Sequence, residues 1–210
     1  MTLQVRTIPA EGLEVRAGED GKQKTLTGYG IVYNRETHLW RDMYEVIRPG
    51  AASEFLKTNP DIKCALNHRP SNYLFGRTKS GTMKIEEDER GVKYTTIPPD
   101  AQWAKDAMAS IERGDIDGSS FTFSVKPQDE KLTQRDDGTF LREIFKFSRI
   151  GEMGPVTDPA YLDTTAEARA KAEYDSLTAP LRTQGDAEKI AETKRTLDLR
   201  KRKLNLQSKS

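Results

Sequence analysis

Short strand-like runs interrupted by glycine fill this sequence up to about residue 160. Gly76, Gly81 and Gly91 mark the joints between successive runs in the middle of the chain. Close spacing with turn residues between the runs favours a β-sheet or barrel. The predicted strands span residues 25–33, 44–48, 62–67, 74–79, 82–86, 92–97, 119–126 and 140–149, with 150–157 continuing or kinking the last one.

One segment has clear helical periodicity. Residues 101–113 place apolar side chains on one helical face, with Asp100 as a candidate N-cap and Gly114 as a candidate C-cap. One or two helical turns are also expected in residues 51–58. The sequence therefore predicts a β-rich α+β fold, with a mainly antiparallel, barrel-like sheet and peripheral helices. The apolar face of the longer helix consists of Ala104, Ala107, Met108 and Ile111.

The composition changes after Pro159-Ala-Tyr161. Residues 164–173 are alanine-rich, 178–186 have the composition of a linker, and 187–204 are charged with a partial heptad of apolar residues. A solvated helix is favoured for this last part. The predicted organisation is a domain at residues 1–165 followed by a charged, helical C-terminal extension at residues 166–210.

The overall charge gives no indication of a polyanionic partner. The chain has 34 Lys and Arg against 33 Asp and Glu, which gives no whole-chain argument for nucleic acid or an anionic membrane surface. No apolar stretch reaches the length of a membrane span, and the N-terminal residues lack the apolar core of a secretion signal. A single cysteine, Cys64, allows no internal disulfide and favours a reducing cytoplasm.

Only two histidines, His38 and His68, are available for chemistry. The sequence contains no HExxH motif, no CxxC pair and no glycine-rich phosphate loop, so no metal or cofactor is expected. His38 lies in a polar segment that favours an exposed loop. His68 ends the apolar run 62–67, where structural and functional roles are both open. Cys64 lies about 13 Å along that strand from His68, so a buried apolar role is favoured over a Cys–His pair.

A second candidate is the serine pair that opens a predicted strand in Gly114-Asp-Ile-Asp-Gly-Ser-Ser-Phe-Thr-Phe123. A nucleophilic serine must be held rigidly near a base, with room for a substrate carbonyl. The start of a strand beside Gly118 offers both. Serines also open strands without any chemical role, and the pattern alone favours that structural interpretation.

Several motifs in order resemble the prohead protease family of tailed bacteriophages. They cover roughly residues 25–165. The resemblance implies a fold related to herpesvirus assembly proteases. The motifs are Gly28-Tyr-Gly-Ile-Val-Tyr33, Glu45-Val-Ile-Arg-Pro-Gly-Ala51, Asn67-His68, Gly76-Arg77, Gly118-Ser-Ser-Phe-Thr-Phe123 and Glu152-Met-Gly-Pro-Val-Thr-Asp-Pro-Ala-Tyr161.

The resemblance implies roles for individual residues. Ser120, directly before Phe121, would be the nucleophile, and Ser119 would occupy a variable position. His68 would be the general base, since an imidazole changes protonation near neutral pH. Glu152 would orient the histidine.

Three further positions bear on these roles. Glu143 is the alternative carboxylate to orient the histidine. Arg149 is a candidate for stabilising the oxyanion. Gly154 departs from the family pattern, in which a serine is usual.

The implied function is that of a serine endopeptidase in procapsid maturation. Its substrates would be scaffolding segments of the major capsid protein, or a scaffold protein, and the protease itself. It would act as an oligomer inside the assembling procapsid in the host cytoplasm, with no membrane and no specific nucleic acid as partners. The alternatives are a non-catalytic capsid-assembly or scaffolding factor with the same fold, and an unrelated β-rich binding module.

Overall fold

The computed structural model describes residues 3–18, 23–157, 172 and 174–179. By its internal contacts the chain divides into two units, Met1–Leu162 and Asp163–Ser210, and the first unit contains every predicted site residue. The predicted boundary at residue 165 and most of the predicted C-terminal extension lie outside the described residues. Residues 172 and 174–179 are helical. The extension as a whole stays a prediction.

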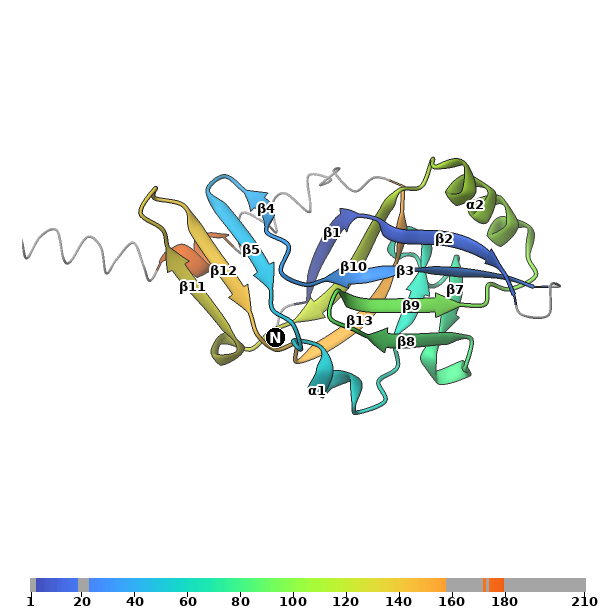
Figure 1. Cartoon of the computed structure of the whole chain (residues 1–210), viewed down its shortest axis with the longest axis horizontal. Helices are drawn as coiled ribbons and strands as arrows, with labels where there is room; N and C mark the ends of the chain where they lie inside the picture. The colour runs from blue at the N-terminus through green and yellow to red at the C-terminus, as the bar shows by residue number, and fades with distance from the viewer. Residues whose placement is uncertain (1–2, 19–22, 158–171, 173, 180–210) are drawn as a thin grey trace, which may run out of the picture. The chain divides into compact units, whose positions relative to one another are not determined.

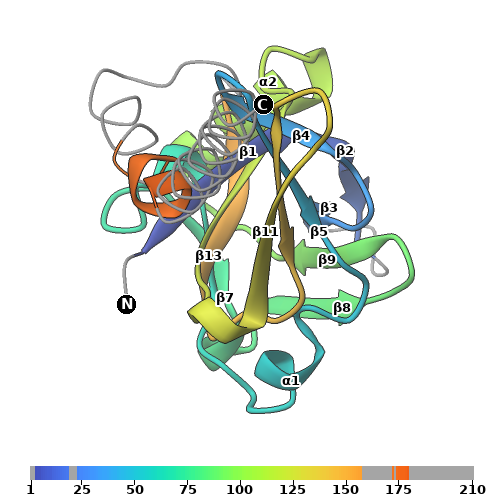
Figure 2. The same cartoon turned by 90° about the vertical axis from the view of Figure 1, so that its left-hand side faces the viewer.

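Three separate β-sheets form the described part of the first unit (Figure 1). Sheet A has the order β1 (Gln4–Pro9), β10 (Gly118–Ser124), β13 (Arg149–Val156), β6 (Lys63–Ala65) and β7 (Leu74–Arg77). Sheet B has the order β2 (Glu11–Ala17), β3 (Lys24–Val32), β9 (Gly91–Thr96) and β8 (Met83–Glu87). Sheet C has the order β11 (Glu130–Gln134), β12 (Phe140–Ile144), β5 (Met43–Ile47) and β4 (Thr37–Trp40). Figure 2 views the unit from the side of sheet C.

The expectation of a β-rich, mainly antiparallel fold is confirmed, but that of a barrel-like sheet is wrong. No sheet closes on itself within the described residues. Strand pairing is antiparallel except between β5 and β12 and between β6 and β13. Short strands at close spacing are equally compatible with open sheets and with a barrel, so their sequence pattern does not determine closure.

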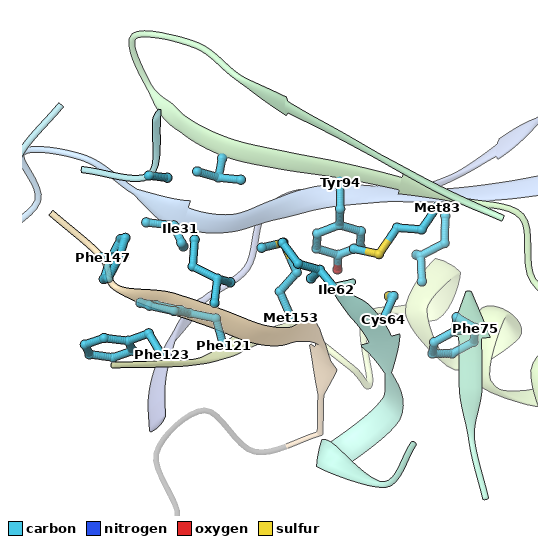
Figure 3. Packing of buried hydrophobic residues seen from close by; sticks show 14 of the residues in the cluster. Ile31, Ile62, Cys64, Phe75, Met83, Tyr94, Phe121, Phe123, Phe147 and Met153 are labelled. Carbon is cyan, nitrogen blue, oxygen red and sulfur yellow. The ribbon is translucent and has the colours of Figure 1, made fainter. Parts of the chain in front are cut away.

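A hydrophobic core lies between sheets A and B (Figure 3). Phe121 and Phe123 on β10 pack with Phe147, with ring centroids 5.1 to 6.2 Å apart. Gly30 on β3 lies against Met153 of β13, where a Cβ on the glycine would be 2.7 Å from the methionine sulfur. The Gly30–Met153 contact holds β13 close against β3 of sheet B, because close-packed side chains leave little room for displacement.

The helices are peripheral to the sheets, as predicted. They are α1 (Ser53–Leu56) and α2 (Gln102–Arg113), and the four predicted apolar residues of α2 are buried. Gly114 ends α2 in the left-handed conformation (φ 86°), so its predicted capping role is confirmed. The prediction for Asp100 is wrong: Ala101 is the N-cap, and Asp100 forms an ion pair with Lys105. Among the described residues, no helix is long and apolar enough to cross a membrane.

Candidate active site

Ser120 lies in the middle of sheet A. It is on β10, with Thr7 of β1 opposite it on one side and Gly154 of β13 on the other. Every residue of β10 is buried. Because side chains alternate along a strand, Ser119 lies on the opposite face of β10, with Phe121. The structure therefore separates the two serines, and only Ser120 faces His68.

The turn after β6 presents His68. Strand β6 ends at Ala65, and a 3₁₀ turn spans Leu66–His68. Asn67 and His68 both have positive φ, 51° and 55°. Such conformations cost energy for residues other than glycine and persist only where surrounding contacts hold them. Here the Asn67 side-chain oxygen accepts a hydrogen bond of 2.9 Å from the backbone N–H of Thr157.

Glu152 reaches the same histidine from β13. Its backbone lies between Thr122 of β10 and Lys63 of β6. The Glu152 side chain is 13% exposed and that of His68 is 28% exposed, so both lie at the edge of solvent. Three different segments, β10, β13 and the turn after β6, thus contribute one polar side chain each to one place.

The three side chains form a continuous chain of contacts. The His68 Nε2 atom lies 2.6 Å from the Ser120 Oγ atom. On the other side of the ring, Nδ1 lies 3.2 Å from Glu152 Oε1. Both are within hydrogen-bonding distance, and the carboxylate is on the ring nitrogen away from the serine. A nucleophile, a base and an orienting carboxylate require this order of contacts.

Gly154 allows β6 to approach β13 closely. A Cβ at Gly154 would lie 2.5 Å from the backbone oxygen and 3.0 Å from the backbone nitrogen of Ala65. A serine here, as is usual in the resembled family, would require the backbone to move. The departure from the family pattern is therefore matched by a close contact between strands. Gly154 allows β6, which leads into the turn that carries His68, to lie close to β13.

Glu143 and His38, two other candidates from the sequence, have partners away from Ser120. Glu143 on β12 accepts hydrogen bonds from Arg48 at 2.6 and 3.0 Å. His38 is exposed but lies on strand β4 rather than in the predicted loop, and its Nε2 atom is 2.6 Å from the Arg41 backbone oxygen. Neither contributes to the contacts around Ser120 described above.

Two further sequence candidates, Arg149 and Cys64, also lie away from the contacts around Ser120. Arg149 pairs with Ser124, and four residues along β10 separate that position from Ser120, a distance of about 13 Å. Cys64 is fully buried, and burial raises the pKa of its thiol. The predicted role of Cys64 as a small buried side chain is confirmed.

Two groups on β1 that were not predicted from the sequence touch the serine. The Thr7 hydroxyl donates to Ser120 Oγ at 3.1 Å, and the Arg6 backbone oxygen accepts from Ser120 Oγ at 2.9 Å. Residues Gln4–Ile8 alternate polar and β-branched side chains in part, which was the available signal for a strand. The register that brings Thr7 to Ser120 could not be derived from that signal.

A buried ion cluster attaches β1 to sheet C. Arg6 on β1 donates to both carboxylate oxygens of Glu45 on β5, at 2.8 and 2.9 Å. Arg142 on β12 donates to the same carboxylate at 2.9 Å and also pairs with Glu130. Burial would raise the pKa of the Glu45 carboxyl, but the positive charges of Arg6 and Arg142 outweigh it and hold the pKa below its usual range. Glu45 therefore has two cationic partners.

The described residues contain no group of three or more His, Cys, Asp or Glu side chains arranged to hold a metal ion. The polar groups around Ser120 are instead hydroxyl, imidazole, carboxylate and backbone carbonyl. Such a set is suited to proton transfer and nucleophilic attack.

In sheet A the structure places a serine, an imidazole and a carboxylate in successive contact, and comparison with known proteins gives the family. The model of the caudovirus prohead serine proteases matches residues 11–177. The chain therefore belongs to this family. The family match sets aside the alternative of an unrelated β-rich binding module.

Two individual proteins are similar to this chain. The prohead protease of Enterobacteria phage HK97 is 30% identical over 162 residues, which cover 74% of this chain and 64% of that protein. The match thus spans less than two thirds of the HK97 protein. Among solved structures, the bacteriophage T4 capsid assembly protease has a TM-score of 0.44 at 15% identity, covering 73% of this chain and 96% of that chain.

Proposed function

We propose that this chain is a serine endopeptidase of procapsid maturation, with Ser120 as nucleophile, His68 as general base and Glu152 as the group that orients His68. The observation that carries the proposal is the pair of contacts from His68, to Ser120 Oγ at 2.6 Å and to Glu152 at 3.2 Å. Family membership supports the same chemistry.

In the first step, Ser120 Oγ attacks the carbonyl carbon of the scissile peptide bond while its proton passes to His68 Nε2. Glu152 stabilises the imidazolium that forms and keeps Nδ1 protonated. The tetrahedral intermediate collapses as His68 returns the proton to the leaving amine, and an acyl-enzyme remains. Water then attacks the ester with His68 again as base, which releases the acid product and restores the serine.

The proposed substrates are scaffolding segments of the major capsid protein, or a scaffold protein, and the protease chain itself. The HK97 relative is a prohead protease by name, and this supports an activity inside the assembling procapsid in the host cytoplasm. We also propose that the protease works as an oligomer there.

The test combines a chemical probe with a natural substrate. A fluorophosphonate probe should label Ser120. Co-expression with the major capsid protein of the same phage should yield a shortened capsid protein. Ser120→Ala should remove both results, while Ser119→Ala, on the other face of β10, is the matched control. A folded protein that neither reacts with the probe nor processes the capsid protein would favour the non-catalytic assembly factor.

Glu152→Gln tests the third residue separately. The amide keeps the size of the side chain but removes the charge that would stabilise imidazolium, so kcat should fall by roughly 10- to 10⁴-fold with little change in KM. Glu143→Gln, which disturbs an ion pair with Arg48, is the matched control. Equal activity of the two variants would argue against Glu152 as the orienting group.

A further inference from the structure

The Ser120 hydroxyl is enclosed on all sides. The residue is 0% exposed, and its Oγ atom contacts His68 Nε2 at 2.6 Å, the Thr7 hydroxyl at 3.1 Å and the Arg6 backbone oxygen at 2.9 Å. Three polar atoms therefore surround this oxygen at hydrogen-bonding distance. A substrate carbonyl carbon must come within about 3–3.5 Å of this atom to react. One of the present neighbours must therefore move before attack.

The contacts from β1 also compete for the proton. The hydroxyl has a single proton, and both the Arg6 carbonyl and His68 Nε2 lie within reach as acceptors. When the proton points at Arg6, it is not shared with the base that must remove it. The arrangement is therefore a resting state, and β1 is the element whose departure would free both the nucleophile and its proton.

The position of β1 at the edge of a sheet would allow this strand to be displaced. It is the edge strand of sheet A and pairs there with β10 alone among the described strands. Only Ile8 of its six residues is buried, and Val5 is 40% exposed. Side-chain contacts to sheet C also hold it, namely the Arg6–Glu45 ion pair and a hydrogen bond from Arg142 to Gln4. Because Arg142 also binds Glu45, this carboxylate would keep a cationic partner after Arg6 left, which avoids the large cost of an unpaired buried charge.

We infer that β1 is a displaceable strand, and that the edge of β10 which it covers is the docking site for the substrate, an extended peptide segment. The inference rests on the proposed function. With β1 displaced, β10 presents unpaired backbone groups that an incoming peptide can pair with antiparallel, as β1 does now. The peptide then places one of its carbonyl groups beside Ser120 Oγ, in the position that the Arg6 carbonyl occupies in the resting state.

The test locks β1 in place within the full chain. Val5 and Thr122 are opposite each other on β1 and β10, so Val5→Cys with Thr122→Cys allows a cross-strand disulfide. Arg16→Cys with Thr25→Cys, opposite each other on β2 and β3, is the matched control away from the site. The native Cys64 is fully buried and does not compete. The probe is a fluorescent peptide of residues 3–10, followed by fluorescence polarisation, with the reversed sequence as its control.

The peptide concentration needed for binding follows from competition between the added peptide and strand β1 of the same chain. A tethered strand has an effective concentration of about millimolar, so the reduced protein should half-saturate at roughly millimolar peptide. The oxidised β1–β10 protein should show no binding in that range, and the control pair should bind equally in both redox states. In the chain without the added cysteines, Arg6→Ala weakens the binding of β1 to its site, whereas the peptide keeps its own arginine and its affinity. The peptide concentration at half-saturation should therefore fall by at least about tenfold.

Equal binding to the oxidised and reduced β1–β10 proteins would overturn the inference, as would absence of binding to both the reduced protein and Arg6→Ala. Labelling of Ser120 by a fluorophosphonate in the reduced protein reports on the proposed function separately. Peptide binding without labelling would argue against the serine protease chemistry while supporting strand displacement. Labelling at equal rates in both redox states would leave the chemistry supported and the covering role of β1 refuted.

Discussion

Replacing Gly154 with alanine tests how tightly the site depends on the approach of β6 to β13. The added Cβ would lie 2.5 Å from the Ala65 backbone oxygen, whereas carbon–oxygen contacts are ordinarily about 3.3 Å or longer, so the strands must separate by about 0.8 Å. The obstructing atoms belong to the backbone and cannot rotate away. Strand β6 leads directly into the turn that carries His68, so the displacement should reach the imidazole.

The magnitude follows from the present geometry. Moving the ring by about 0.8 Å would stretch the 2.6 Å contact between His68 Nε2 and Ser120 Oγ to roughly 3.4 Å, beyond good hydrogen-bonding distance. Misplacement of a catalytic group by about 1 Å can cost about 100-fold in rate. Overpacking should also lower the free energy of unfolding by about 1–3 kcal/mol. We therefore expect a folded protein with roughly 100-fold slower reaction.

The assay is the rate at which a fluorophosphonate labels Ser120, with thermal unfolding measured in parallel. Gly151→Ala is the matched control on the same strand, because its Cβ would meet the Thr122 hydroxyl at 3.0 Å, a side-chain atom that can rotate away. Gly151→Ala should keep most of the labelling rate. A Gly154→Ala protein that is destabilised yet labelled at the unchanged rate would refute the link between this contact and the placement of His68.

The remaining predictions concern single side chains and use fluorophosphonate labelling or capsid-protein cleavage as readouts. Ser120→Ala should abolish both, whereas Ser119→Ala should keep them; the reverse pattern would move the nucleophile by one residue. His68→Ala should be as damaging as Ser120→Ala, and the double variant no worse, because the two groups act as a unit. His38→Ala should retain near-full activity, and its loss in a folded protein would point to a second catalytic histidine. Asn67→Ala should lower the rate about tenfold by straining a left-handed turn, and Asn67→Gly less so; equal rates would contradict that reason.

Much of the sheet structure could be predicted from local pattern. The strand predicted at residues 25–33 is Lys24–Val32, and the helix predicted at 101–113 is Gln102–Arg113. The clearest omissions, β4 and β11, are the two edge strands of sheet C. Edge strands bury fewer side chains, so their sequences carry weaker alternation. How the strands divide into three sheets depends on pairing between distant segments, which local pattern does not encode.

Glu152 and Glu143 show where sequence alone could not decide the site. Both are glutamates on predicted strand segments, nine residues apart, and the residue pattern gives no physical reason to prefer either one. The structure separates them through their neighbours: Arg48 holds Glu143, while the pairing of β13 beside β6 brings Glu152 to the His68 ring. The structure thus brings the three preferred residues together, and their catalytic roles stay predictions for the experiments above.

The covering of Ser120 by β1 depends on register, and this is why no motif could reveal it. Thr7 and Ser120 are 113 residues apart in sequence, yet their hydroxyls are in contact. A shift of one residue between β1 and β10 would turn Thr7 to the core and Arg6 to the surface, because strand side chains alternate. The Arg6–Glu45 ion pair opposes that shift, because Arg6 would lose both of its hydrogen bonds to the Glu45 carboxylate. The same pair that anchors the strand therefore also sets which carbonyl group lies beside the serine, and a substrate that replaces β1 must find its own register on β10.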